Sequence, residues 1–523
     1  MAMGITKMTR SEWKYGRRPV ALAVLALLSS QAPSVTAAEW HFTPRLDLRE
    51  TYSDNVNLAP SGSEQSSFVT EVMPGFTLNG IGRRSRFTAS YQARSVNYSN
   101  NNFGSNLQHY LAATGNAQLV EDLLFIDGSA NVSNISTSPF GPQALDSTYA
   151  TSNRTEVRSY TISPYLSKRY GSLAQGELRY THQGLSADTV GFSNYNSDRL
   201  NLNVSSGEAF RVLGWNVAAS RQQSRYSNLD SVASDYLNGT LRYRITDQFR
   251  LTGSAGYERY TYQSVGESPQ GASWSVGFIW QPSLRTNLEA SAGRRFYGTA
   301  YMLNGTHRSR HTTWNVSYNE DITTTQEQLA NPGTVSTTAF LNQAFLANIP
   351  DPVARGQAVD AFIRATGLPA YLSTGATGLS NRFFLQKRLQ ASVALTSGKS
   401  TAVLTAFDVL RRPQTDVGNN TGLLINNGGL LLSDQSRQKG VSGLWSLRVA
   451  PLTTMNLNAQ YYRTSSLLTN RTDDNTLLTL GVSRRLSPRV NGTVEVRRYQ
   501  GSSNQGAFDF RENAISAILS MQL

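Results

Sequence analysis

Histidine, serine and acidic side chains are the groups in this chain that could take part in catalysis or bind a metal. His307 and His311 are four residues apart, which on a helix would suit a metal ion, but on a strand their separation is roughly 13 Å. The chain has 0 cysteines, so it offers no thiolate ligand or nucleophile. No His-Glu-x-x-His motif occurs, and no spacing selects a Ser-His-Asp triad. We therefore expect no enzyme, no metal site and no cofactor.

Arginines in segments that alternate polar and apolar residues are the other candidate functional groups. Ten of them lie on the polar face of their segment: Arg86, Arg94, Arg179, Arg242, Arg244, Arg250, Arg295, Arg388, Arg448 and Arg497. If these faces line an enclosed lumen, the interior favours anions, as charged rings do in pores. Glu177, Glu258 and Glu495 share these faces, so a self-neutralising ladder of Arg/Glu pairs that stabilises the wall is an equally weighted and compatible explanation.

The net charge does not indicate a nucleic-acid partner. The formal charge of +13 includes +4 from residues 1–37 (five basic residues minus Glu12), which leaves about +9 for the rest of the chain. A nucleic-acid-binding surface concentrates its basic residues in a patch or along a helix. Here the arginines are spread along strands, so we expect no nucleic acid.

Alternation with a period of two residues runs through most of the chain. Every second residue is apolar in Phe87–Ala93, Leu251–Tyr257, Trp274–Trp280, Met455–Tyr461 and Val490–Val496, and the residues between them are polar or small. Successive side chains of a strand face opposite sides, so each segment has one apolar and one polar face. The runs are typically ten or more residues long, which exceeds the strands of a soluble sandwich and suits tilted strands that cross a bilayer.

The links between these segments alternate in length. Short links include Glu121–Asp122, Gly171–Ser172, Thr246–Gln248 and Ser487–Arg489, and longer polar loops include Ser53–Ser66, Thr137–Ser152 and Ser186–Asn194. Short periplasmic turns and long extracellular loops are typical of outer-membrane barrels. The fold class we predict is all-β: a transmembrane antiparallel up-and-down β-barrel of about 22 strands, from Trp40 to Leu523. The turn spacing also predicts a strand pair that reverses at Asn319–Asp321, with Ile322–Gln328 rising again.

Residues 1–37 read as a signal peptide. A basic stretch that includes Arg17 and Arg18 precedes an apolar core, Val20–Leu28, and small residues at Val35–Ala37 suit cleavage. The core is too short to cross a bilayer as a helix. We therefore assign residues 38–523 to the barrel and expect the bacterial cell outer membrane as its location. Strands that begin at Trp40 leave no room for an N-terminal plug or passenger, so we expect neither a TonB-dependent transporter nor an autotransporter.

One stretch, residues 329–380, breaks the alternation and is predicted to be a long extracellular insertion. Asp351-Pro352 suits a helix start and Gly367 with Pro369 suits its end, which places a helix near 352–366. Val359, Phe362 and Ile363 then share one face. The helix could fold inward as a gate, or it could pack against neighbouring loops, which is the commoner arrangement in long loops.

The start of the mature chain carries a resemblance. Two stretches carry it: Arg45–Pro60, which contains Tyr52-Ser53-Asp54-Asn55-Val56-Asn57-Leu58, and then Val72-Met73-Pro74-Gly75-Phe76. They resemble the opening of the PEP-CTERM-system-associated outer-membrane proteins. These are similar to a porin-like family found near exopolysaccharide gene clusters. The resemblance implies a role in an envelope or exopolysaccharide-export system, with no enzymatic activity and no binding residues to carry over.

Two functional hypotheses follow. The first is a porin or export channel whose arginine-bearing lumen passes anionic or sugar-like solutes, including exopolysaccharide. The second is a non-conducting structural or docking barrel that acts through its loops. In both, the expected partners are outer-membrane lipid and lipopolysaccharide, together with the barrel-assembly machinery, which reads a C-terminal strand such as Ile515–Leu523.

Overall fold

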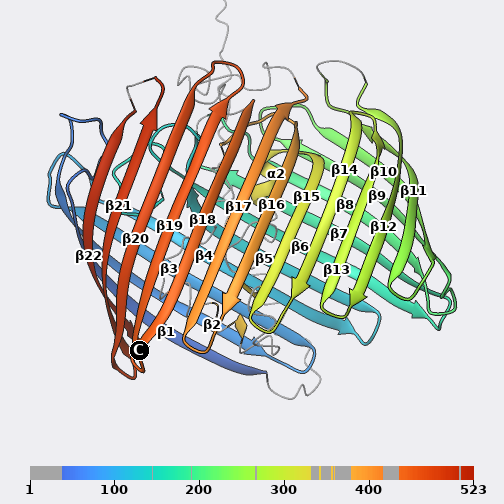
Figure 1. The fold of residues 1–523 in the computed structure, drawn as a ribbon, viewed down its shortest axis with the longest axis horizontal. Helices are drawn as coiled ribbons and strands as arrows, with labels where there is room; N and C mark the ends of the chain where they lie inside the picture. The colour runs from blue at the N-terminus through green and yellow to red at the C-terminus, as the bar shows by residue number, and fades with distance from the viewer. Residues whose placement is uncertain are drawn as a thin grey trace, which may run out of the picture.

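A computed structural model of the chain describes residues 38–143, 145–189, 191–264, 268–330, 341–342, 355–356, 359, 378–415, 435–505 and 508–523. The predicted signal peptide, residues 1–37, lies outside the described residues. No helix among the described residues is long and apolar enough to cross a membrane. The described chain is almost all strand, and Figure 1 shows the strands arranged as one closed wall.

Within the described residues, twenty-two antiparallel strands form this wall, and β22 pairs with β1 to close it. The number of strands agrees with the prediction. The strands are β1 (Glu39–Ser53), β2 (Ser67–Ile81), β3 (Ser85–Tyr98), β4 (Asn106–Val120), β5 (Leu124–Ile135), β6 (Thr155–Tyr170), β7 (Ala174–Ala187), β8 (Tyr195–Ser206), β9 (Leu213–Tyr226), β10 (Val232–Arg244), β11 (Phe249–Tyr260), β12 (Gln270–Ser283), β13 (Thr286–Arg295), β14 (Gly298–Arg308), β15 (Thr312–Thr323), β16 (Phe384–Thr396), β17 (Ser400–Pro413), β18 (Ser436–Ala450), β19 (Thr453–Ser466), β20 (Thr472–Ser487), β21 (Val490–Ser503) and β22 (Phe510–Gln522).

The links between strands alternate as predicted, except that β13 and β14 are joined at the long-loop end by residues 296–297 alone. Links from even- to odd-numbered strands are short, such as 284–285 and 451–452, whereas the opposite end carries loops such as 54–66 and 136–154. The chain leaves β22 at the short-turn end, and Figure 1 shows the C-terminus there. By the usual orientation of such barrels, this end faces the periplasm and the long loops face outward.

The predicted reversal at Asn319–Asp321 is wrong. β15 continues through these residues to Thr323 and stays paired with β16, with Asn319 opposite Arg388 and Asp321 opposite Gln386. The polar Asn-Glu-Asp run suggested a turn, but cross-strand pairing to β16 keeps it extended. The residues predicted to rise as the next strand instead form a short helix, α2 (Thr325–Ala330).

The outer face is an apolar belt. Large apolar side chains such as Leu241, Val276 and Val494 are 56%, 60% and 55% exposed in the isolated chain. Aromatic pairs mark both ends of the belt: Trp40 and Phe87 are 6.0 Å apart toward the short turns, and Tyr52 and Phe68 are 5.0 Å apart toward the long loops. Only closure satisfies every strand edge in lipid, and two aromatic girdles mark the membrane interfaces. The chain is a β-barrel of the bacterial outer membrane.

We expect a charged residue in the lipid-facing belt to destabilise the barrel, and to do so most near the bilayer midplane. Val276 is the central exposed residue of β12, and Ser275 beside it faces the lumen. Val276→Arg should lower the free energy of unfolding in lipid vesicles by about 2–4 kcal/mol, because the charge lies near the bilayer midplane. Ser275→Arg is the depth-matched control and should cost much less. Urea titration followed by tryptophan fluorescence measures both, and equal costs would contradict the assigned faces.

Candidate functional site: a lumen bridged from wall to wall

Helix α2 begins because its sequence supplies an N-terminal cap. The Thr324 side chain accepts a hydrogen bond from the Glu327 backbone N–H at 3.1 Å. Thr324-Thr325-Gln326-Glu327 has the Ser/Thr-x-x-Glu spacing of a capping box, which satisfies backbone donors at a helix start. This cap ends β15 and turns the chain inward, so that α2 lies within the barrel (Figure 1).

Side chains of α2 hold opposite walls of the barrel. On one side, Glu327 forms an ion pair with Arg199 of β8. On the other, Gln328 donates a hydrogen bond to Gln386 of β16 at 2.8 Å and accepts one from Arg411 of β17 at 3.0 Å. The Ala330 carbonyl of the helix also accepts from Thr161 of β6 at 3.4 Å. Since β6 and β17 are eleven strands apart in a ring of 22, α2 crosses the lumen.

Apolar packing fixes the β6–β8 end of this bridge. Ala330 is buried against Val157 and Leu185 of the inner wall, together with Tyr195 and Leu379. Asn381, close to Leu379 in sequence, accepts a hydrogen bond from Gln326 of the helix at 3.1 Å. The helix and the segment that returns to β16 therefore stabilise each other on the inner wall.

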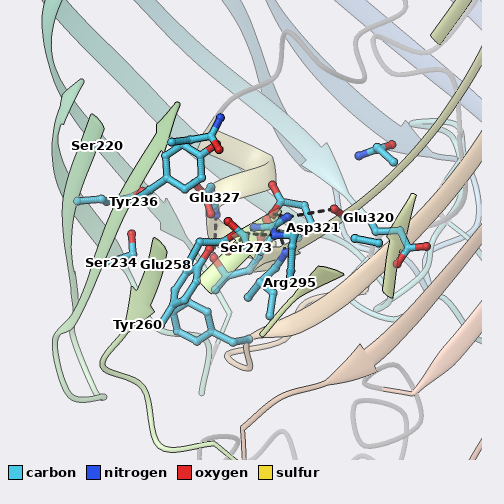
Figure 2. Close-up of a pocket in the computed structure, with 18 of the residues that line it drawn as sticks. Ser220, Ser234, Tyr236, Glu258, Tyr260, Ser273, Arg295, Glu320, Asp321 and Glu327 are labelled. Atoms are coloured by element: carbon cyan, nitrogen blue, oxygen red, sulfur yellow. Dashed lines mark hydrogen bonds and ion pairs between the residues drawn. The ribbon is translucent and has the colours of Figure 1, made fainter. Parts of the chain in front are cut away.

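A cavity of about 590 Å³ lies beside α2, against the inner faces of β8–β15. Figure 2 shows its lining, in which hydroxyl-bearing and aromatic side chains surround a group of charges. Serine hydroxyls recur along the wall, at Ser220, Ser224, Ser234, Ser254, Ser273, Ser275 and Ser291. Tyrosines add aromatic faces that also carry a hydroxyl group: Tyr195, Tyr226, Tyr236 and Tyr260. Such a wall can hydrogen-bond a polyhydroxylated solute and stack against its apolar faces.

The charges in this cavity are paired. Arg295 makes two bonds to the Glu258 carboxylate, at 2.6 and 2.8 Å, and a third contact to Asp321 at 3.2 Å. The Glu258 side chain is 3% exposed whereas that of Asp321 is 61% exposed. The bidentate pair fixes the guanidinium in the wall, and Asp321 keeps a carboxylate facing the open part of the cavity.

A second segment, the 136–154 loop, also folds into the lumen. Asp146 of this loop contacts Arg49 of β1 at 3.1 Å and Arg497 of β21 at 2.9 Å. The neighbouring Ser147 donates to Glu71 of β2 at 2.6 Å. Arg49 and Arg497 are each less than a tenth exposed, so their charges are compensated inside the barrel. The loop therefore fills the lumen beside β1, β2 and β21.

The electrostatics of the loop favour a charged Asp146. Burial alone would raise the pKa of this carboxyl, but the guanidinium groups of Arg49 and Arg497 hold its pKa well below the usual range. Tyr149 of the same loop packs with Tyr499 at 5.7 Å between ring centroids, and burial raises the pKa of its phenol. Asp146 therefore stays charged and Tyr149 stays neutral across physiological pH.

The alternation places all ten predicted lumen arginines on the inner face. Five of them lie at mid-height or toward the extracellular end of the barrel. Arg179, Arg295 and Arg497 each have a carboxylate within 2.6–2.8 Å. Arg94 donates to Ser147 at 3.1 Å and lies over the Tyr110 ring. The Nε of Arg388 is buried with no hydrogen-bond partner among the described residues. The ion-paired members form the self-neutralising ladder that was the alternative explanation for these residues.

The other five arginines lie near the short-turn end: Arg86, Arg242, Arg244, Arg250 and Arg448. Arg244 pairs with Asp247 at 3.2 Å, and Arg448 donates to the Gly398 carbonyl at 3.0 Å. The remaining three have no ion pair or hydrogen bond within the described part of the chain. Glu289 on the inner face offsets part of this charge. The periplasmic mouth therefore keeps positive charge that the wall does not neutralise.

The predicted gate helix falls mostly outside the described residues. Phe362 and Ile363 are outside the described residues, whereas Val359 is described, is helical and is 0% exposed. From the sequence we do not predict the inward-folded elements that the structure describes: we predict a strand at Ile322–Gln328, where α2 begins, and a polar extracellular loop at Thr137–Ser152. The capping box at Thr324–Glu327 was a signal in the sequence that could have located α2.

The chain matches no protein-family model and no curated protein. Among solved structures it is similar to the siderophore receptor PirA from Pseudomonas aeruginosa, at 9% identity and a TM-score of 0.45, over 94% of this chain and 81% of that one. The FrpB iron transporter from Neisseria meningitidis (F5-1 variant) gives 10% identity and a TM-score of 0.49, over 92% and 82%. What this barrel can do follows from its own inner wall.

We expect Asp146 to hold the 136–154 loop in the lumen. Asp146→Asn leaves Arg49 and Arg497 without this carboxylate, which should weaken docking by about 3 kcal/mol. Trypsin at pH 8 should then cleave at Arg154, at the end of the loop, much faster than in the wild type. Asp188→Asn, at an exposed ion pair with Arg158, is the control and should have little effect.

The pH dependence of the same contact has a defined sign. A lowered pKa in the folded state means that the contribution of Asp146 is complete above about pH 3.9, its ordinary value, and is lost as the pH falls below it. Hydrogen exchange of residues 136–154, corrected for the intrinsic rate, should show equal protection at pH 8 and pH 5. Loss of protection between those values would contradict the assignment.

Proposed function

We propose that this barrel is a gated outer-membrane channel for anionic or sugar-like solutes, with α2 as the movable bridge across its lumen. The observation that carries the proposal is the location of α2, which is tied to β8 on one side and to β16 and β17 on the other. Apolar packing anchors α2 at its β6–β8 end, whereas only polar contacts hold it to β16 and β17, and such contacts can exchange for water at modest cost. The bridge is therefore suited to shift as a solute passes.

The charge at the periplasmic mouth supports a preference for anions. Arg86, Arg242 and Arg250 project from the inner face near the short turns and lack an acidic partner among the described residues. Positive side chains that line a narrow aqueous path concentrate anions and repel cations. An acidic solute that approaches from the periplasm meets this charge first, which suits the direction of export.

The cavity beside α2 supports a sugar-like cargo. Its serine hydroxyls and tyrosine rings offer the hydrogen bonds and flat apolar faces that a saccharide uses. The resemblance of Arg45–Pro60 and Val72–Phe76 to PEP-CTERM-system-associated outer-membrane proteins supports exopolysaccharide as the cargo. An acidic exopolysaccharide would use both the arginines of the mouth and the hydroxyl-rich wall.

A second candidate function is a non-conducting barrel that acts through its extracellular loops. It is favoured by the two segments that enter the lumen, since both α2 and the 136–154 loop occupy space that an open porin leaves to water. The two functions differ in one measurable property, which is whether ions cross the barrel.

Conductance in planar bilayers tests the channel directly. The wild type should give stepwise currents that select anions, and Arg242→Glu with Arg250→Glu should bring the chloride-to-potassium permeability ratio to about one or invert it. Arg244→Gln is the control, because Asp247 already neutralises much of this charge. It should change the ratio only slightly.

The outcome separates the two functions. A correctly folded barrel that never conducts would overturn the channel and favour the docking barrel. Conduction whose selectivity ignores both substitutions would overturn the assignment of the mouth.

A further inference from the structure

The outer wall carries a groove as well as a convex belt. A depression of about 890 Å³ lies across β12–β20 and is lined by outward-facing apolar side chains that include Trp314, Leu404 and Val441. Its volume falls in the range of sites that hold small ligands. β15–β20 run side by side on the near face of Figure 1. The groove therefore opens toward the lipid and not toward the lumen.

The register of the strands shows what lies at the extracellular end of the groove. Val441 of β18 pairs with Tyr461 of β19, and both line the groove. Two residues further toward the long loops, Lys439 pairs with Arg463 on the same outer face. The apolar lining thus passes directly into a pair of cations at the level of the outer-leaflet headgroups.

This pair belongs to a wider cationic rim. Five basic side chains face outward above the groove: Lys387, Arg412, Arg437, Lys439 and Arg463. Three acids lie among them: Glu320, Asp408 and Asp474. The described residues of the rim therefore carry an excess of two positive charges, and the rim spans β16–β19, which is about 14 Å at ordinary strand spacing.

Acidic partners orient the rim cations but leave them accessible to a ligand. Arg437 makes bonds of 2.6 and 2.9 Å to Asp408, and Arg463 makes bonds of 2.7 and 2.9 Å to Asp474. Lys439 is 3.8 Å from Asp408 and its side chain remains 55% exposed. Exposed pairs of this kind are weak and yield readily to a stronger anion, and a phosphate accepts charge-assisted bonds from arginine and lysine.

We propose that this groove and its rim bind a phosphorylated, multiply acylated glycolipid of the outer leaflet. The acyl chains lie in the apolar groove, and the sugar phosphates contact Lys439, Arg463 and the neighbouring cations. A row of cations about 14 Å long suits a disaccharide with a phosphate at each end. The headgroup of a glycerophospholipid carries one phosphate and reaches only part of the row.

The opposite wall supplies a matched comparison. Arg158 and Arg225 also face outward near the long loops, and their side chains are 56% and 53% exposed, against 55% and 53% for Lys439 and Arg463. Both also have acidic partners. Neither lies on the strands that line the groove. If the exposure of the substituted cations decided binding, the two double substitutions would have equal effects, whereas the proposed site predicts that only the substitutions at the groove weaken binding.

Native mass spectrometry of the delipidated, refolded protein in detergent can test this site. The probe is a hexa-acylated diglucosamine lipid with two phosphates. Lys439→Gln with Arg463→Gln should weaken binding about 30-fold, because each surface cation contributes about a five- to sixfold effect. Arg158→Gln with Arg225→Gln should leave binding within about threefold. Heat-modifiable electrophoretic mobility confirms that each variant is folded.

A second variant tests the groove with its charges intact. Ala459→Phe places a ring in the apolar lining on the lipid face and should weaken binding while leaving the barrel folded. Equal affinity in the groove variants and the wild type would overturn the proposal. Equal binding of the dephosphorylated lipid, or equal competition by phosphatidylglycerol, would also overturn it and indicate a general lipid surface.

Discussion

The pairing of β1 with β22 is the constraint on which the rest of this structure depends. In a bilayer an open strand edge leaves backbone N–H and C=O groups without water, so the sheet must close. Nine residue pairs join the two strands, from Arg45 opposite Gln522 to Ser53 opposite Ala514. Side chains reinforce the outer end of this seam: Ser53 donates to Glu512 at 2.9 Å, and Asn55 donates to the Arg511 carbonyl at 3.0 Å. The Tyr52–Leu58 motif therefore reinforces the extracellular end of the seam.

The diameter of a barrel grows with its number of strands, and side chains of the wall fill the interior only in barrels of about eight strands. Closure with 22 strands therefore creates a lumen that the wall side chains cannot fill. The chain fills much of this space with its own inward-folded segments. Those segments need polar partners, which explains why buried charges such as Arg49, Glu71 and Arg497 occur on the inner face near the 136–154 loop. The role of an inner arginine thus depends on its position along the barrel axis. Arginines in the extracellular half hold the inward-folded segments, whereas those at the periplasmic mouth leave positive charge exposed.

The wall could be predicted from the sequence because its rules are local. Alternation assigns each residue to a face, and the lengths of the links assign each end, so the number of strands and the inner location of the arginines follow from periodicity. The contents of the lumen could not be predicted in this way. Asp146 meets Arg49 across 97 residues of sequence, and no local pattern marks that pairing. Asn319–Asp321 was misread for a related reason, since its partner strand β16 begins only at Phe384.

In the proposed channel, α2 is a movable bridge inside a rigid wall and controls passage through the lumen. The chain has no cysteine, so Arg199→Cys with Glu327→Cys places two unique thiols where the ion pair joins β8 to α2. A short bifunctional thiol reagent with a reducible link can then fix the bridge. Single-channel recording should show conductance that fluctuates in the free double variant, becomes steady at its low level after cross-linking, and recovers on reduction. Conductance that is identical in all three states would contradict the claim that α2 is the gate.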